Sequence, residues 1–571
     1  MVDLLRQVPG LHVDQIGGRG GGSSVYLRGS DPNFTLVLID GVKVNDPTNA
    51  RGGSFDFATL NVQNIERIEI VRGPLSSVHG SDAMAGVINI VTRHGTPEPE
   101  YSMEISGGTS GYYSGSAQAQ GPCSEIVDYA LSAAYVDNGT PVEGDEFVGK
   151  SFNGRVSAFP SDLSHLQWVM RYADNHSESF PDDSGGPEFA VLREVDKRDT
   201  ADLVMGLEIV HEPLSLLELS LNCGWYHHEE DVSSPGVAPG ARDPFGIPPN
   251  NSKSTLDRTN IEAKTLISFS DAMLASIGME SQFEQGSSDS TLFYGGSPVP
   301  ASFKVNREVY SPFLELQYCS KIGLTIQGGL RIDVPDDFDT KVSPKLGAIY
   351  KLKSTQTTIK ANWGKGFKLP SFFALGNPIV GNPELLPESS EGFDFGVIQG
   401  LWNDRVTVSA TPFYSRFFDM IDLDEGPPPR LVNRTEVTAK GVEFAVATQF
   451  NEKLWLNAHL TYTKTDVENT DEKLRNRPEW CGGINARWEP TAFLMLNLDV
   501  LHVGKALDSS IPTGDRNLDA YTRLDASAIW TLGPNWQIAF AIENILDADY
   551  EEAVGFPAPG VQGRVSARLT F

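Results

Sequence analysis

The chain has 571 residues, more than the roughly 250–300 at which one ordinary core stops growing, so it either splits into domains or closes into a large barrel. Its 75 acidic and 45 basic residues give a net charge of −30, which excludes nucleic acid as a partner because phosphate binding requires a basic surface. The mean hydropathy is −0.23, and no apolar run approaches the ~18–20 residues of a membrane helix, so a helical membrane protein is excluded. Membrane-spanning strands are not excluded, because each is only about 9–11 residues long and half polar.

The first residues lack the features of a signal peptide. Met1 to Leu4 contain neither a basic stretch nor the beginning of an apolar one. If the protein is exported, we therefore expect that this start is misassigned or that the chain is a fragment.

The pattern of apolar and turn residues over 1–95 predicts a compact α+β unit. Leu4, Leu5 and Val8 indicate a short helix that ends before Pro9-Gly10. Short apolar runs between turn residues then predict strands over 25–27, 35–39, 65–71 and 86–92.

Residues 96–571 follow a different pattern, in which strands and turns alternate to the end of the chain. In the last strand Val565, Ala567, Leu569 and Phe571 alternate with polar residues, so one face is apolar and the other polar. The same alternation occurs over 456–463, 523–532 and 536–543. The 571 − 95 = 476 residues hold roughly twenty strands at about 10 residues each plus connections.

Long polar stretches separate some of these strands, whereas others are joined by tight turns such as 532–535. We expect long loops over 174–199, 230–257, 286–302, 376–390 and 463–478. Long loops at one rim and short turns at the other are typical of outer-membrane barrels. A soluble protein of several β-sandwiches is the alternative, and it explains the terminal aromatic and the loop asymmetry less well.

Four cysteines, Cys123, Cys223, Cys319 and Cys481, are widely separated. None forms a CxxC pair, which disfavours a zinc or redox motif. We expect isolated small residues in strands, although disulfides between them stay open.

Several motifs resemble those of the TonB-dependent outer-membrane receptors. In the first unit the resemblance lies in 5–10 (LRQVPG), 25–29 (VYLRG), 38–42 (LIDGV) and 65–93 (IERIEIVRGPLSSVHGSDAMAGVINIVTR). In the second it lies in 366–370 (GFKLP), 381–388 (GNPELLPE), 440–443 (KGVE) and 544–550 (NILDADY). The size of the chain and the stretch 17–29 (GGRGGGSSVYLRG) are most similar to the cobalamin (vitamin B12) receptors and the short siderophore receptors.

The resemblance implies an all-β transmembrane barrel of about 22 antiparallel strands, 96–571, whose lumen holds an α+β plug domain, 1–95. It also implies active import of a metal chelate, a ferric siderophore or a cobalamin, by a monomer in the lipid of the bacterial outer membrane. The energy would come from TonB with ExbB and ExbD. Relative to the family, the signal peptide, the TonB box and the first part of the plug are missing, and we expect a misassigned start codon rather than a real truncation.

The resemblance further implies ion pairs that hold the plug in the barrel. Arg28 and Arg72 precede glycines at strand ends, and the matching barrel carboxylates are Asp394 and Glu443. A carboxylate inside a restricted lumen favours a bidentate arginine partner. We expect Arg72 to pair with Glu443, and Asp394, where the family usually has Glu, to pair less directly.

The plug loops 17–24 and 44–55 match the positions at which related receptors contact ligand. We expect ligand contacts from Arg19, Gly20, Ser23, Asn45, Asn49 and Arg51. The glycines of 17–22 let the backbone approach a large ligand closely, and no GK[ST] follows to suggest a phosphate-binding loop. A flexible loop without ligand is the alternative.

Acidic loop residues are candidate ligands for Ca²⁺, which prefers oxygen, as in the loops of cobalamin receptors. The candidates are Asp137, Asp145, Asp182 and Asp183. None has EF-hand spacing, so a solvated surface is the simpler interpretation.

Two other classes of function compete with a transporter. An outer-membrane enzyme would need a nucleophile with a base, and the chain contains neither GxSxG nor HExxH. A passive porin would not need a folded unit of 95 residues in its lumen. We therefore expect a non-enzymatic transport receptor with no covalent cofactor.

Overall fold

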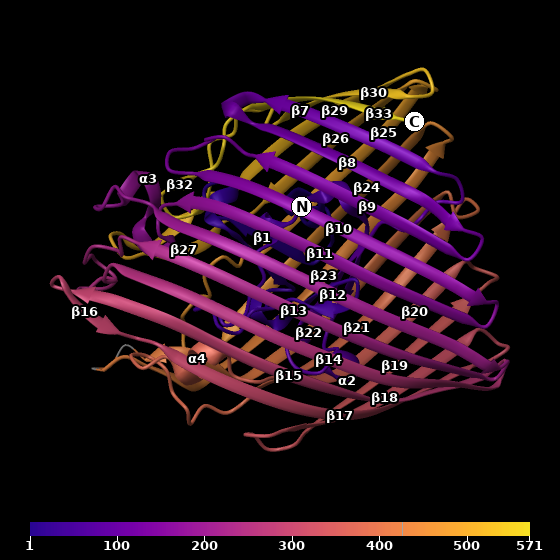
Figure 1. The fold of residues 1–571 in the computed structure, drawn as a ribbon, viewed down its shortest axis with the longest axis horizontal. Coiled ribbons are helices and arrows are strands. Elements are labelled where there is room, and N and C mark those ends of the chain that lie inside the picture. Colours follow the sequence, from indigo (N-terminus) through magenta and orange to yellow (C-terminus); the bar gives the residue numbers. More distant parts are fainter. Residues whose placement is uncertain (425, 427) are drawn as a thin grey trace.

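The computed structural model describes residues 1–424, 426 and 428–571. Within these residues, 22 antiparallel strands close into a barrel, and the N-terminal part of the chain lies inside it (Figure 1). This confirms the fold predicted from the sequence. No helix in the described part of the chain is long and apolar enough to cross a membrane.

The plug consists of short elements joined by turns. They are α1 (Val2–Arg6), β1 (Leu11–Gln15), η1 (Arg19–Gly21), β2 (Ser23–Leu27), η2 (Pro32–Phe34), β3 (Thr35–Ile39), β4 (Val42–Lys43), η3 (Phe57–Thr59), η4 (Val62–Asn64), β5 (Ile65–Arg72), α2 (Ser76–His79) and β6 (Gly86–Thr92). The helix before Pro9 and the four predicted strands are all present, and two of the strands match their predicted bounds.

A four-stranded sheet in the order β4-β3-β6-β5 forms the centre of the plug. β3 and β6 are parallel neighbours, and every residue of β3 is buried. A continuous apolar run such as TLVLI suits a strand covered on both faces. On one face Val37 and Ile39 belong to a core that continues through Phe34 to Phe417 and Val437 of the barrel wall, so plug and barrel share an apolar cluster. On the other face Leu36 and Leu38 pack with Ala83 and Val87 of the plug.

The barrel begins after a connection of seven residues that contains the predicted domain boundary. Its strands are β7 (Glu100–Gly108), β8 (Tyr113–Ser124), β9 (Val127–Asp137), β10 (Glu146–Ser161), β11 (Ser164–Ser179), β12 (Asp196–Leu214), β13 (Leu217–Ser234), β14 (Asn250–Ser270), β15 (Met273–Tyr294), β17 (Phe303–Cys319), β18 (Leu324–Pro335), β19 (Lys341–Leu352), β20 (Thr357–Lys368), β21 (Glu388–Leu401), β22 (Val406–Asp424), β23 (Arg430–Asn451), β24 (Leu454–Val467), β25 (Trp480–Thr491), β26 (Leu494–Val503), β29 (Tyr521–Leu532), β30 (Trp536–Glu543) and β33 (Gln562–Thr570).

Smaller elements lie in the connections of the barrel. They are η5 (Thr109–Gly111), η6 (Asp182–Ser184), α3 (Gly186–Phe189), β16 (Ser297–Pro300), α4 (Phe372–Gly376), β27 (Ala506–Ser510), β28 (Gly514–Leu518), β31 (Glu551–Ala553) and β32 (Phe556–Pro557). Most of them lie at one rim, on the left of Figure 1, and the opposite rim has short turns such as 162–163 and 215–216.

The last strand closes the barrel. β33 pairs with β30 on one side and with β7 on the other, in a register that places Leu569 opposite Met103. Phe571 and Tyr101 exchange backbone hydrogen bonds of 2.9 Å, and their rings stack. The terminal strand therefore pairs with the first strand of the barrel near Tyr101.

Four of the five predicted long loops are shorter than the sequence predicts, whereas the connection 369–387 is longer than the predicted 376–390. β11 runs to Ser179 and β12 begins at Asp196, so 174–179 and 196–199 are strand and only 180–195 connect the two strands. β13, β14 and β15 extend in the same way into 230–257 and 286–302. A polar stretch predicts a loop, but a strand that extends beyond the lipid can be polar on both faces. Its backbone hydrogen bonds continue with its neighbour, so nothing ends it at the membrane.

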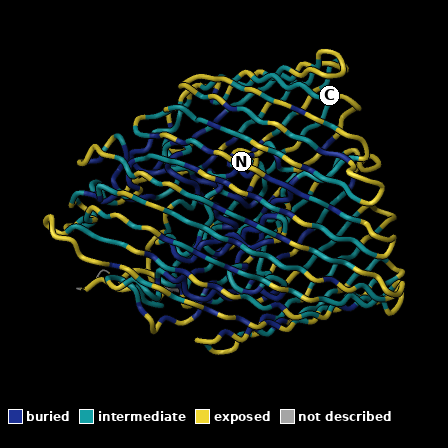
Figure 2. The backbone as a smooth tube through the Cα atoms, viewed as in Figure 1, coloured by how far each residue is buried: buried dark blue, intermediate teal, exposed yellow. Residues whose placement is uncertain are grey.

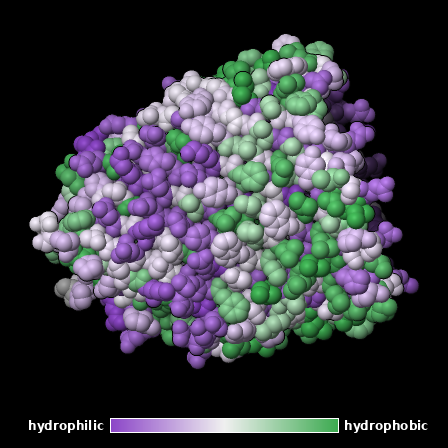
Figure 3. Space-filling model, in the orientation of Figure 1, coloured by the Kyte–Doolittle hydropathy of each residue, from purple (hydrophilic) through white to green (hydrophobic). Residues whose placement is uncertain are grey.

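The outer surface of the barrel has an apolar half and a hydrophilic half. Apolar side chains gather over the half of the barrel with the short turns, and hydrophilic ones over the half with the long loops (Figure 3). Trp488, Trp530 and Trp536 are exposed on the outside near the short turns, as an interfacial aromatic girdle requires. The buried residues concentrate inside, around the plug (Figure 2). All four cysteines are free.

The terminal strand gives a prediction about depth in the membrane. Ala567 lies opposite Ile105 and Ile538 on the lipid face, whereas Leu569 lies beside Trp536 near the short-turn rim. Arginine at position 567 should therefore cost about 2–4 kcal/mol of unfolding free energy, and at position 569 only about 0–1 kcal/mol. Urea unfolding of Ala567→Arg and Leu569→Arg in lipid vesicles measures both, and equal costs would contradict this placement.

Candidate functional site

An ion cluster of Arg28, Arg72, Asp394 and Glu443 joins the plug to the barrel. Arg28 follows β2 with a φ of 50°, and this left-handed turn points its side chain at the wall. Its Nε lies 2.7 Å from Glu443 Oε1 on β23, and its Nη1 lies 3.3 Å from Asp394 Oδ2 on β21. These three side chains are almost fully buried, so the cluster is a desolvated one.

Arg72 makes the weaker contribution to this cluster. Its Nη1 lies 3.3 Å from Glu443 Oε2, its side chain is 29% exposed, and it also donates to the carbonyl of Pro9. Gly10 lies under the same carboxylate, where a Cβ would be 2.2 Å from Glu443 Oε1. The structure thus brings the four predicted residues together, but the central cation is Arg28, which bonds to both carboxylates.

Further plug–barrel ion pairs, none of them predicted from the sequence, surround the plug. They are Arg6–Glu552, Asp31–Arg477, Asp40–Arg155, Lys43–Glu280 and Asp82–Lys368. Asp82 and Lys368 both lie in motifs that the family resemblance had singled out, so this pair could have been found. In each of the other pairs the barrel residue lies outside the motifs, so the pairing depends on the register of the barrel.

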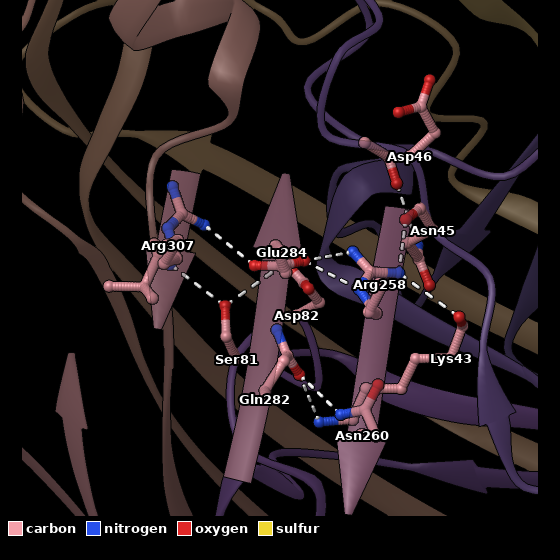
Figure 4. Close-up of polar contacts among 12 residues, drawn as sticks. Lys43, Asn45, Asp46, Ser81, Asp82, Arg258, Asn260, Gln282, Glu284 and Arg307 are labelled. Carbon is pink, nitrogen blue, oxygen red and sulfur yellow. Dashed lines mark hydrogen bonds and ion pairs between the residues drawn. The ribbon is translucent and has the colours of Figure 1, made fainter. Parts of the chain in front are cut away.

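A network of polar side chains on strands β14, β15 and β17 also contacts the plug (Figure 4). Arg258 pairs with Glu284 at 2.6 Å and donates to the backbone carbonyl of Asn45 at 2.7 Å. Arg307 lies 3.8 Å from the same glutamate. The wall therefore holds the backbone of the plug loop that follows β4.

The predicted ligand contacts divide into buried and accessible residues. Ser23 and Asn45 are each 2% exposed: Ser23 bonds to Asp56, and Asn45 bonds to the backbone of residues 35, 37 and 53. In this conformation they stabilise the plug loops and do not face the exterior. Gly20 is also buried and donates its N–H to Asp145 at 2.6 Å.

The other three candidates lie closer to the long-loop rim. Arg19 donates to the carbonyls of Ala58 and Leu60, and its guanidinium stacks on Phe147. Asn49 is half-buried, and Arg51 pairs at 2.5 Å with Asp182 of the loop 180–195. Arg51 thus links the apex of the plug to a barrel loop.

The four predicted calcium ligands have other partners. Asp182 pairs with Arg51 and Asp183 with Arg242, while Asp137 and Asp145 accept backbone N–H bonds from Gly139 and Gly20. Within the described residues, no three His, Cys, Asp or Glu side chains are grouped so as to hold a metal ion. Calcium binding by these loops stays a prediction.

Barrel loops close over the apex of the plug. Phe556 packs on Gly17, and Phe180, Ala190, Ala553 and Phe556 form a small apolar cluster. The N–H of Ile511 donates to the carbonyl of Asp183, which joins the loop 504–520 to the loop 180–195. Outside this closure an open cavity of about 510 Å³ lies between the ends of β12–β15, with Arg193, Lys197, Asn250 and Phe293 in its lining. We call the long-loop rim of the barrel, with its loops, the mouth.

Asp14 is a buried carboxyl between the plug and the barrel loops. It accepts hydrogen bonds from the Ser24 N–H, the Tyr26 hydroxyl and the Asn476 amide. Burial raises the pKa of Asp14 to about 7, and these hydrogen bonds only partly oppose it.

Residues 1–87 match the family described as "TonB-dependent Receptor Plug Domain", and residues 137–545 match "TonB dependent receptor-like, beta-barrel". The vitamin B12 transporter BtuB of Vibrio vulnificus is 24% identical over 100% of this chain and 89% of its own length.

Solved structures share the fold. The siderophore receptor PirA from Acinetobacter baumannii has a TM-score of 0.81 at 17% identity, covering 100% of this chain and 96% of its own. The ferric yersiniabactin uptake receptor FyuA from Yersinia pestis has a TM-score of 0.82 at 16% identity, covering 100% and 95%. At such identities these likenesses concern the fold alone.

The ion cluster gives a prediction about plug retention. Arg28→Met leaves two buried carboxylates short of a cation and should cost about 3–5 kcal/mol of plug stability, whereas Arg72→Met should cost less. Vancomycin sensitivity of cells and urea unfolding measure the effect. Arg67→Met is the matched control, because that exposed arginine pairs only with Glu66 and Glu69 of the plug. Unchanged leakage in Arg28→Met would contradict the role of the cluster.

Asp14 gives a prediction about pH. Its folded pKa lies above its unfolded value of 3.8, so the native state binds the proton more tightly and gains stability as the pH falls from about 8 towards 4. Asp14→Asn should remove this gain, which amounts to about 4 kcal/mol at most. The measurement is the urea midpoint of both proteins across this range. Parallel pH profiles would show that Asp14 is not the titrating group.

Proposed function

This chain belongs to the TonB-dependent receptors, transport proteins of the bacterial outer membrane and not enzymes, and we propose that it imports a cobalamin. Import would be active and would leave the ligand chemically unchanged. The energising partner would be TonB with ExbB and ExbD, and the receptor would act as a monomer in outer-membrane lipid.

The observation that carries the choice of ligand is the charge of the mouth. Asp and Glu outnumber Lys and Arg in its loops, with acidic residues at positions 143, 182, 183, 188, 194, 336, 337 and 339. A mouth of one sign lowers the local concentration of ligands of the same sign and slows their association. It therefore disfavours the multiply anionic ferric catecholates and favours a chelate without net negative charge, such as a cobalamin.

Several basic side chains of the mouth already have acidic partners, so they are less free to bind an anionic ligand. Arg242 pairs with Asp183 at 2.8 Å, Arg193 with Glu143 at 2.5 Å, and Lys505 with Asp519 at 2.8 Å. Recognition of an anionic chelate relies on guanidinium groups that can turn to it. In the lining of the 510 Å³ cavity, Arg193 and Lys197 are paired with Glu143 and Glu178, and the amides of Asn250 and Asn251 with the ring of Phe293 remain for neutral recognition.

The relatives point in the same direction. Those matched over nearly the whole chain carry the name vitamin B12 transporter, at 24% and 25% identity. A ferric siderophore is the second candidate, supported by the names of receptors that share the fold. For such a ligand the acidic mouth favours an iron chelate without net negative charge. A passive porin is not favoured, because the plug occupies the lumen.

The proposal predicts how binding depends on charge and salt. Purified receptor should bind cyanocobalamin with an affinity that changes less than about twofold between low and high salt, because a neutral ligand has little to screen. A ferric catecholate should not compete. Equilibrium dialysis measures both, with a receptor that lacks loop 180–195 as the control for binding at the mouth. Competition by the catecholate, or no binding of cyanocobalamin, would contradict the proposal.

A further inference from the structure

A cavity of about 560 Å³ lies between the plug and the barrel wall, in the half of the barrel that has the short turns. On the plug side it is bounded by residues 40–43, by His79 and by His94. On the wall side it is bounded by the short-turn halves of β10 to β15, including Gly206, Gly224 and Asn260. The predicted ligand contacts at the mouth are not among the residues that line it.

Residues 40–43 form a tight hairpin between β3 and β4, which we call hairpin 40–43. Its Val42 lies against two glycines, Gly206 of β12 and Gly224 of β13, that face each other in the strand register. A Cβ on Gly206 or Gly224 would lie 3.3 Å or 3.2 Å from a methyl of Val42. These glycines give the wall a smooth depression that any larger residue would fill.

Charged groups hold both ends of the hairpin to the same side of the wall. Asp40 pairs with Arg155 of β10, which also donates to Thr92, and Lys43 Nζ lies 2.7 Å from Glu280 Oε1 of β15. The side chains of both pairs are at least nine-tenths buried. Such pairs have directional geometry but little net stability, because desolvation offsets their attraction. Asp40, Lys43, Arg155 and Glu280 all line the cavity, so water can reach the separated groups when the hairpin leaves.

The wall also holds the backbone where the hairpin continues towards the mouth. Arg258 donates to the carbonyls of Lys43 and Asn45 (Figure 4). The next residues lead directly to Asn49 and Arg51, and Arg51 pairs with Asp182 of the loop over the mouth. A displacement at the ligand-facing apex therefore reaches the hairpin through a few residues of continuous chain.

The opposite side of the plug is held differently. There the ion cluster of Arg28 and the apolar contact of Phe34 with Phe417 join the plug to β21–β23. An apolar contact that separates exposes its surface to water. The hairpin side also has an apolar part, because Val42 and Val44 belong to the same cluster as residues of β12–β14, but this part already borders a cavity. Opening on the hairpin side thus creates less new surface.

We propose that hairpin 40–43 is the gate of the plug, and that ligand crosses between this hairpin and strands β12–β14, through the 560 Å³ cavity. The cavity is smaller than a cobalamin, so the hairpin must leave the wall for passage. The Arg28 side of the plug stays attached. The identity of the ligand rests on the proposed function, but the position of the gate does not.

A disulfide between the hairpin and the wall tests the gate. A Cβ at position 224 would lie 3.6 Å from the Cβ of Val42, within the roughly 3.5–4.5 Å of a disulfide. Val42→Cys/Gly224→Cys, in a Cys223→Ser background, should bind cyanocobalamin at the mouth when oxidised but lose uptake in the native bacterium. Reduction should restore uptake, which shows that the protein is folded.

The matched control attaches the plug to the opposite wall. A Cβ at position 29 would lie 4.0 Å from the Cβ of Ala439, so Gly29→Cys/Ala439→Cys forms a second disulfide, with some strain because Gly29 has a φ of 77°. Uptake should persist in this variant when oxidised. Uptake through the oxidised hairpin lock, or equal loss in both variants, would overturn the proposal.

A measurement without ligand separates the gate from the proposed function. Asp40→Asn/Lys43→Met removes both ionic anchors and should raise ion conductance in planar bilayers above that of the unmodified receptor. Adding the oxidised 42–224 disulfide should abolish the increase. Failure of cyanocobalamin to bind would count against the proposed function only, whereas unchanged conductance would overturn the gate.

Discussion

The burial of Arg28 between Glu443 and Asp394 is the interaction on which the rest of the structure depends. A closed barrel of this width has a polar lumen, and an object inside it cannot be held by hydrophobic contact alone. Complementary charges fix the orientation of the plug, because each carboxylate of the wall would be costly to bury without its cation. The remaining plug–barrel pairs repeat this principle around the lumen, so the plug has one position in the barrel.

The barrel is in contact with lipid, with its own lumen and with water, and the alternation of side chains along each strand suits all three. Alternate residues face lipid and lumen, and beyond the membrane both faces meet water. This explains why β11 to β15 continue through stretches that resemble loops in the sequence. It also explains the surface in Figure 3, where apolar side chains cover only the half of the barrel near the short turns.

The two ends of the plug differ in chemistry in a way that suits vectorial transport. At the mouth, acidic loops close over the apex, and Arg51 joins them to the plug. In the other half, hairpin 40–43 lies against a glycine depression beside a cavity and is held by exchangeable ion pairs. A continuous stretch of chain joins the two. Ligand recognition and gating can therefore be coupled without a change in the barrel itself.

The sequence by itself determined the barrel, the plug and the four members of the ion cluster. Alternation over 565–571 requires a two-sided strand, and motifs such as 65–93 identify the family. Only the tertiary structure decided that Arg28 and not Arg72 is central, that Ser23 and Asn45 are interior, and that Asp40 and Lys43 meet Arg155 and Glu280. The physical reason is register: a partner several strands away is fixed by the stagger of the closed barrel, which no local pattern of residues records.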